Sequence, residues 1–146
     1  MSLSPHFTLA ELTRTGTGIA NDPAPSQVAA LTSLCLHVLE PIRTLLGVPL
    51  RITSGYRSAA VNAAIKGALL SQHVKGEAAD FMPVGMDVEV AMGRIVAARL
   101  PVDQLIVYPR GGFIHVSHAA QRVQRGELLR SAAPGGSGGP YSRWTP

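Results

Sequence analysis

The sequence has one cysteine, few aromatic residues and no long apolar run, and each shortage excludes a class of protein. A single cysteine, Cys35, cannot staple a small domain with disulfides. No stretch approaches the ~18 apolar residues that span a bilayer, and the N-terminus lacks the basic start and apolar core of a secretory signal. We therefore expect neither a membrane span nor a signal peptide. Hydrophobic residues at 46% against 15% charged ones exclude a disordered chain.

The basic residues outnumber the acidic ones but do not cluster. The net charge is +4 and the pI is about 9.8. Lys66 and Lys75 are the only lysines among 13 basic residues, and the arginines are scattered from Arg14 to Arg143. Three Phe, three Tyr and one Trp offer little material for a stacking platform. Because a nucleic-acid-binding protein normally has a basic stripe with interleaved aromatics, we do not expect nucleic acid as a partner.

The 146 residues correspond to one domain that mixes helices with short strands. Apolar residues spaced three and four apart predict a long helix over 26–46, with Cys35 in its buried stripe and Pro41 kinking or breaking it. The predicted strands cover 50–53, 78–82, 103–108 and 113–118, and the shorter helices cover 8–14, 58–66 and 87–100. We therefore expect an α+β fold, a short mixed or antiparallel sheet with helices packed on it. It occupies residues 1–130, and 131–146 form a flexible tail rich in Gly, Ser and Pro.

The most informative stretch, residues 71–81, holds candidate metal ligands. His73 and Asp80 stand seven residues apart, and Gly76 between them allows the chain to turn back. In the predicted strand, Asp80 shares a face with the small Ala78 and therefore projects into open space. His115 in a later strand offers a third ligand. Two imidazoles and one carboxylate with an open fourth position are a ligand set typical of catalytic zinc.

The predicted hairpin of strands 103–108 and 113–118 places a tyrosine near the same site. With a four-residue loop, Tyr108 pairs with Phe113 and Ile106 pairs with His115, so Tyr108 faces the metal side. His118 lies three residues after His115 and points to the opposite face of a regular strand. A ligand pair of His115 and His118 is therefore not expected.

These motifs resemble those of the M15 peptidases, the family of zinc D-Ala-D-Ala carboxypeptidases, and in particular its compact branch of phage and bacterial cell-wall enzymes. Its SxHxxGxAxD signature is met at every fixed position, here Ser71, His73, Gly76, Ala78 and Asp80. The stretch 53–58 is similar to the SGYRS turn of the family, and 114–117 to its strand with the third ligand. The resemblance covers about residues 6–118 and implies a Hedgehog/DD-peptidase-like fold.

The resemblance also implies roles for individual residues. It implies that His73, Asp80 and His115 ligate one Zn²⁺, and that Arg57 holds a substrate carboxylate or the developing oxyanion. Ser71 and Gln72 are expected to shape the substrate cleft, although plain polar loop residues would look the same.

The general base of the family has no counterpart among the carboxylates of this chain. The two usual positions are occupied by Gly112 and Tyr108. Tyr108 with an ordinary pKa near ~10 is a poor base at neutral pH. It would donate a hydrogen bond to an oxyanion, lower its pKa beside the cation, or be only a strand-end aromatic. The second oxygen of Asp80 is another candidate proton acceptor.

The resemblance thus implies a zinc metallopeptidase that cleaves a D-amino-acid-containing peptide bond in peptidoglycan. The alternatives are a non-catalytic, zinc-containing wall-binding module and a structural component of a phage particle. Without a signal peptide, we expect cytoplasmic synthesis followed by release through a lysis system or delivery in a phage particle. A monomer is expected.

Overall fold

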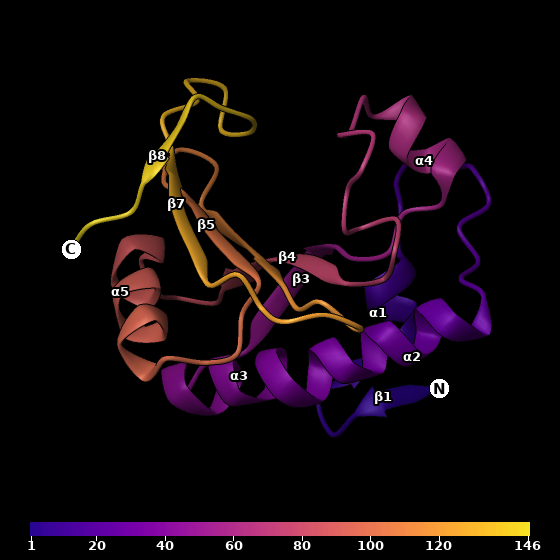
Figure 1. Cartoon of the computed structure of the whole chain (residues 1–146), viewed down its shortest axis with the longest axis horizontal. Coiled ribbons are helices and arrows are strands. Elements are labelled where there is room, and N and C mark those ends of the chain that lie inside the picture. The colour runs from indigo at the N-terminus through magenta and orange to yellow at the C-terminus, as the bar shows by residue number, and fades with distance from the viewer.

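A computed structural model describes residues 1–146, and a six-stranded mixed sheet forms its centre (Figure 1). The strand order is β3-β4-β6-β5-β7-β8, and a separate two-stranded sheet joins β1 and β2. The strands are β1 (Ser2–Ser4), β2 (Phe7–Thr8), β3 (Leu50–Ser54), β4 (Ala78–Pro83), β5 (Gln104–Tyr108), β6 (Phe113–Ser117), β7 (Glu127–Ser131) and β8 (Tyr141–Arg143). The α+β class and the mixed sheet predicted from the sequence are confirmed.

The long helix predicted over 26–46 is present as Pro25–Leu46, but it contains a π-helical stretch. It consists of α2 (Pro25–Leu34), the π-helix η1 (Cys35–Leu39) and α3 (Glu40–Leu46). The wider π turn comes directly before Pro41, which has no N–H to donate and would crowd a preceding α-helical turn. The proline thus disturbs the helix through a π-helical turn just before it, and the helix continues to Leu46 without the break that was the other possibility.

This helix belongs to the hydrophobic core. It has 22 residues, and an 18-residue stretch within it has a mean hydropathy of 1.3, so by length and composition alone it could cross a membrane. That is weak evidence, because a core helix has the same properties, and here one stripe of side chains is fully buried. Cys35 lies in this stripe as predicted, and burial raises the pKa of its thiol to about 12. The stripe comprises Leu31, Leu34, Cys35, Val38, Leu39 and Ile42.

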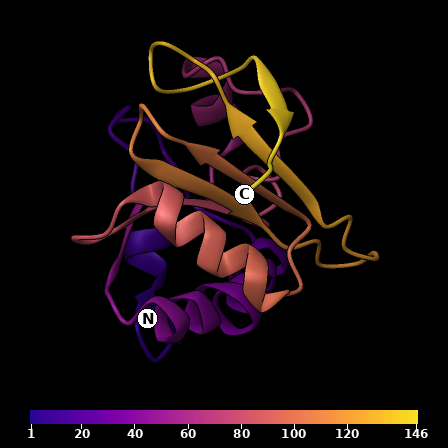
Figure 2. The same cartoon turned by 90° about the vertical axis from the view of Figure 1, so that its left-hand side faces the viewer.

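The sheet has one face in the core and one face that carries polar side chains. Alternate residues of the central strands, such as Phe81, Leu105 and Ile114, are fully buried in the core cluster. Each such side chain contributes about 1.5–3 kcal/mol on burial. Helix α5 (Val88–Ala98) and the long helix cover this face (Figure 2). Helices α1 (Leu9–Thr13) and α4 (Ala59–Ala64) complete the fold.

The segment 131–146, predicted as a flexible tail, lies on the edge of the sheet. Ser131 ends β7, which runs parallel to β5, and Tyr141–Arg143 form β8 antiparallel to β7. Backbone hydrogen bonds flank the pairing: the Ala132 N–H donates to the Pro140 carbonyl at 2.9 Å, and the Trp144 N–H to the Leu128 carbonyl at 2.9 Å. The segment therefore extends the sheet, with β8 as its edge strand.

Candidate metal centre

The structure brings His73, Asp80 and His115 together at the polar face of the sheet. One ligand-capable atom from each residue lies within 4.8 Å of the other two. Asp80 on β4 and His115 on β6 are direct partners across the ladder, and the turn before β4 returns His73 to them. The strand parity that placed Asp80 on the open face is therefore correct.

The separations between these atoms suit a metal ion. His73 Nε2 lies 3.4 Å from Asp80 Oδ1, and His115 Nδ1 lies 2.9 Å from the same oxygen. Ligand atoms that bind zinc tetrahedrally at 2.0–2.1 Å are roughly 3.3 Å apart. The side chains are 5% exposed for His73 and 13% exposed for Asp80 and His115, so the donor set is largely shielded from water.

A backbone carbonyl orients the imidazole of His73. Its Nδ1 lies 2.7 Å from the carbonyl oxygen of Gly55, which can only accept, so Nδ1 carries the proton and Nε2 offers a lone pair toward Asp80. Burial lowers the pKa of His73 although Asp80 opposes the shift, which favours the neutral ring. A neutral, oriented imidazole is the form that binds metals.

Asp80 is held as a carboxylate. Burial alone would raise its pKa, but contact with His73 and the hydrogen bond from His115 place the pKa well below the usual range. Its second oxygen, Oδ2, lies 3.5 Å from Nη2 of Arg57. The cluster therefore combines two imidazoles with one anionic oxygen donor, and the residues present fit a divalent cation.

Arg57 reaches the centre from the turn after β3. Its backbone N–H donates to the His73 carbonyl at 3.1 Å, and its Nε–H donates to Ser54 Oγ at 3.1 Å. Burial lowers the pKa of Arg57 and Asp80 raises it, and the guanidinium remains a cation. Of its five N–H donors, the side-chain contacts to Ser54 and Asp80 use two. Three donors therefore remain for an anion in the cleft.

These residues line a cleft of about 800 Å³. Ser71 and Gln72, predicted to shape the cleft, are part of its wall, and they also hold the ligand turn. Ser71 Oγ accepts from the His73 N–H at 3.2 Å, and Gln72 Nε2 donates to Glu77 Oε1 at 3.2 Å. Five basic residues line the cleft, and Asp80 is its only carboxylate. The basic residues are Arg57, Lys66, Lys75, Arg122 and Arg125.

Tyr108 lines the same cleft, with the hairpin pairing predicted from the loop length. Tyr108 pairs with Phe113, and Ile106 pairs with His115. The rings of Tyr108 and Phe113 stack at 4.3 Å, and the Tyr108 hydroxyl lies 3.0 Å from that of Tyr141. Burial and this hydrogen bond raise the pKa of Tyr108 far above its usual value. Its hydroxyl therefore stays protonated and suits the role of a hydrogen-bond donor, not that of a base.

Two residues that contribute to the site, Tyr141 and Gly55, were not predicted from the sequence. Tyr141 lies in the segment expected to be a flexible tail, and only the alternation in residues 141–144 hints that Tyr141 and Arg143 share a face. Gly55 acts through its carbonyl, for which the sequence has no signal. His118 lies outside the cluster, as its parity predicts, and stacks on His37 with ring centroids 5.3 Å apart.

Replacing Gly55 by alanine is expected to weaken metal binding by about 10–100-fold, the usual cost of disturbing a group that orients a ligand. An added Cβ would stand 2.3 Å from the carbonyl oxygen of Leu12, so the turn that positions His73 and Arg57 must shift. Competition with a metallochromic chelator measures the affinity. Gly93→Ala on α5 is the control, because its Cβ meets nothing within 4 Å. Equal affinities for both variants would contradict the orienting role of Gly55.

The sequence profile of one family, Peptidase M15, matches residues 5–117. No curated protein matches the chain. The matched region includes all three residues of the candidate centre and Arg57, and it ends at the last residue of β6. Because the match covers most of the 146 residues, the chain belongs to the Peptidase M15 family, whose members are metal-dependent peptidases.

Proposed function

We propose that this protein is a zinc peptidase that hydrolyses a peptide bond next to a D-amino acid in the stem peptides of peptidoglycan. The observation that carries the proposal is the convergence of His73, Asp80 and His115 in an open cleft beside Arg57. Two imidazoles with one carboxylate favour zinc over calcium or magnesium, which prefer all-oxygen sites. The chemistry that zinc supplies in such a site is Lewis-acid polarisation of a carbonyl group and activation of water.

Arg57 supports a substrate with a carboxylate near the cleaved bond. Its guanidinium lies against Asp80 and keeps three N–H donors free, a number that suits bidentate binding of a carboxylate or of a developing oxyanion. A terminal D-alanine would supply such a carboxylate for a carboxypeptidase. A side-chain carboxylate would supply it for an endopeptidase.

The charge of the cleft supports an acidic peptide. Five basic side chains line the cleft with one carboxylate, Asp80, which belongs to the metal centre. Two of the five, Arg122 and Arg125, share the carboxylate of Asp103, so the lining keeps an excess of positive charge. Stem peptides of peptidoglycan carry several carboxylates, so their charge is complementary to this wall. Ser71 and Gln72 lie in the wall next to His73 and serve here as substrate-binding residues.

Proton transfer is the part of the reaction for which the chain offers the fewest groups. No second carboxylate lines the cleft, and the hydroxyl of Tyr108 stays protonated. Oδ2 of Asp80, which contacts only Arg57 at 3.5 Å, is the one anionic oxygen placed to accept a proton, and its low pKa makes it a weak base. The donor for the oxyanion is Arg57, because the hydroxyl of Tyr108 already bonds that of Tyr141.

This shortage of bases favours a second candidate function, a zinc-containing module that binds cell-wall peptides or forms part of a phage particle without turnover. Retention of the ligands and of Arg57 would then serve binding alone. The cleft lining supports this alternative through the missing carboxylate, and supports the peptidase through the complete donor set.

Zinc-loaded protein is expected to release D-alanine, or new amino groups, from purified peptidoglycan and from a synthetic tripeptide that ends in D-alanyl-D-alanine. Removal of the metal by a chelator should abolish release, and reloading with zinc should restore it. Protein that sediments with peptidoglycan and releases nothing would establish the binding module. Protein that neither binds nor cleaves would refute both functions.

A further inference from the structure

The C-terminal segment places Tyr141 in the same row of side chains as Tyr108. Ser131 on β7 pairs with Tyr141 on β8, and Val107, the residue before Tyr108, pairs with Arg130, the residue before Ser131. The small Ser131 thus separates two tyrosines on one face of the sheet, so their rings can meet above it. The neighbouring row on this face holds Asp80, His115 and Ile106. The tyrosines therefore lie two residues further along the strands than the metal centre, on the same face of the sheet.

The two tyrosines form a pair in the wall of the cleft. Their hydroxyl oxygens are 3.0 Å apart, and their rings meet edge to face with centroids 6.1 Å apart. Phe113 stacks on the other side of Tyr108, and all three aromatic residues line the cleft. Tyr108 is buried, whereas Tyr141 is 46% exposed. Tyr141 is thus the member of the pair that faces an incoming ligand.

Counting protons shows that the pair has a donor to spare. Each hydroxyl supplies one proton, and the bond between the two oxygens uses one of them. No other hydrogen bond engages either hydroxyl. The remaining proton is available to an acceptor in the cleft, and the shared bond polarises it.

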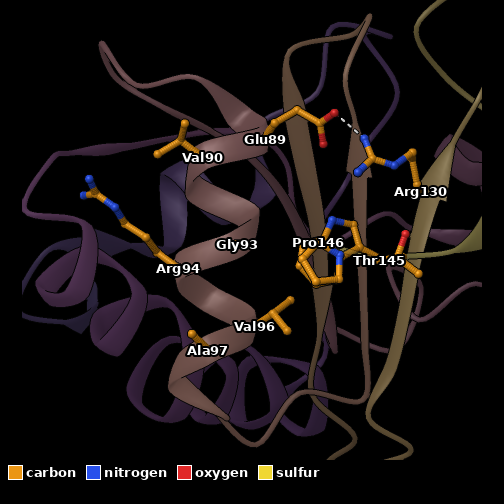
Figure 3. A pocket seen from close by; sticks show the side chains of 10 residues that line it. Glu89, Val90, Gly93, Arg94, Val96, Ala97, Arg130, Thr145 and Pro146 are labelled. Carbon is orange, nitrogen blue, oxygen red and sulfur yellow. Dashed lines mark hydrogen bonds and ion pairs between the residues drawn. The ribbon is translucent and has the colours of Figure 1, made fainter.

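The segment is anchored on both sides, so Tyr141 is held in place. On the opposite face of the sheet, Trp144 packs against the core, and Thr145 and Pro146 line a pocket whose other wall is α5 (Figure 3). On the near side, a Cβ at Gly111 would stand 2.2 Å from the carbonyl oxygen of Gly136, which shows how closely the 131–140 loop rests on the β5–β6 turn. Such a fixed wall loses little conformational entropy when a ligand binds.

We propose that Tyr141, which lies beyond the residues matched by the family, is a substrate-binding residue. Together with Tyr108 it donates the spare hydroxyl proton to a backbone carbonyl of the bound peptide. Two residues along a strand span roughly 7 Å, so the carbonyl belongs to a residue one or two positions from the cleaved bond. This inference rests on the proposed function, because it assumes that a peptide occupies the cleft.

The test compares zinc-loaded wild-type protein with Tyr141→Phe, with Tyr108→Phe and with the double variant. Calorimetric Kd values and the KM and kcat for the D-alanyl-D-alanine tripeptide are measured. Ser142→Ala is the matched control, because Ser142 neighbours Tyr141 and its hydroxyl makes no hydrogen bond. Trp144, the only tryptophan, reports by its emission that the segment stays docked.

Tyr141→Phe is expected to raise Kd and KM by roughly three- to tenfold, the size of one neutral hydrogen bond, with kcat within about twofold. Tyr108→Phe should weaken binding less than Tyr141→Phe, because Tyr141 then keeps its own proton and loses only the polarising bond, and the double variant should be no weaker than Tyr141→Phe. Wild-type affinity in Tyr141→Phe with unchanged Trp144 emission would overturn the inference and leave the proposed function standing. A wild-type protein that does not bind the tripeptide would instead overturn the proposed function, and the inference with it.

Discussion

Replacing His115 by alanine is expected to remove bound zinc and to lower peptide hydrolysis by at least about a thousandfold, a loss of several kcal/mol of transition-state stabilisation. Replacing His118 by alanine is expected to change neither quantity. The two histidines are only three residues apart, so the comparison tests whether the position of the imidazole, and not the mere presence of a histidine, determines metal binding.

The difference follows from the sides on which the two imidazoles lie. His115 Nδ1 is 2.9 Å from Asp80 Oδ1, and without it only two ligands remain on the metal centre. His118 lies outside the cluster, with its Nδ1 2.7 Å from the Pro101 carbonyl. A site of two protein ligands does not meet the three that catalytic zinc requires.

Metal content after exhaustive dialysis, measured by mass spectrometry of the metal, separates the two variants. Wild-type protein and His118→Ala should retain one zinc each, and His115→Ala should retain less than a tenth of an equivalent. Circular dichroism controls for the fold. Stoichiometric zinc in folded His115→Ala would show that the ion binds elsewhere.

The arrangement of the central strands was predictable because it depends on local rules. A four-residue loop determines which residues of β5 and β6 face each other, and the two-residue period then assigns every side chain to a face. The pairs Tyr108–Phe113 and Ile106–His115 follow from these rules and are found in the structure. The same parity correctly placed Asp80 on the open face and His118 away from it.

The support of the metal centre was less predictable, because its partners are distant along the chain. The signature spacing singles out His73, but the carbonyl of Gly55 that orients its ring lies 18 residues away. The hydrogen bond of the Tyr108 hydroxyl is made with Tyr141, which is 33 residues away. Such contacts depend on tertiary packing, for which a single sequence contains no periodic signal.

The C-terminal segment shows how composition can mislead. Gly, Ser and Pro dominate residues 134–140, and such a composition is typical of linkers. Here glycine permits close packing instead, since Gly111 and Gly136 meet backbone to backbone. Two short strands and Trp144 then attach the segment to the sheet and to the core.

The buried carboxylate of Asp103 holds the loop that leads into β7. The Asp103 side chain has no exposed surface. It accepts two hydrogen bonds from the Arg122 guanidinium, at 2.6 and 3.0 Å, and two from the Arg125 guanidinium, at 3.0 and 2.8 Å. The Arg125 N–H adds a fifth at 2.8 Å. Both arginines also line the cleft, so Asp103 couples stability to the shape of the site.

Asp103→Asn is expected to lower the free energy of unfolding at pH 7 by about 3 kcal/mol, and Tm by roughly 6–12 °C. Breaking a buried ion pair costs about 3–5 kcal/mol, and the lower end applies because water screens the two guanidiniums, which are 47% and 49% exposed. Asp22→Asn is the matched control, because Asp22 is exposed and has no ion pair, and it should change stability by less than about 0.5 kcal/mol.

The difference between wild type and Asp103→Asn should also depend on pH with a defined sign. Burial alone would raise the pKa of Asp103, but the hydrogen bonds from Arg122 and Arg125 hold it well below the usual range. A carboxylate whose pKa is lowered by folding contributes stability above its unfolded pKa of about 3.9, and this stability is lost as the pH falls below it. Urea unfolding between pH 7 and pH 2.5 should therefore show a constant gap down to about pH 4.5 and a shrinking gap below it. A gap that stays constant down to pH 2.5 would mean that the asparagine disturbs packing, and that the charge of Asp103 contributes nothing.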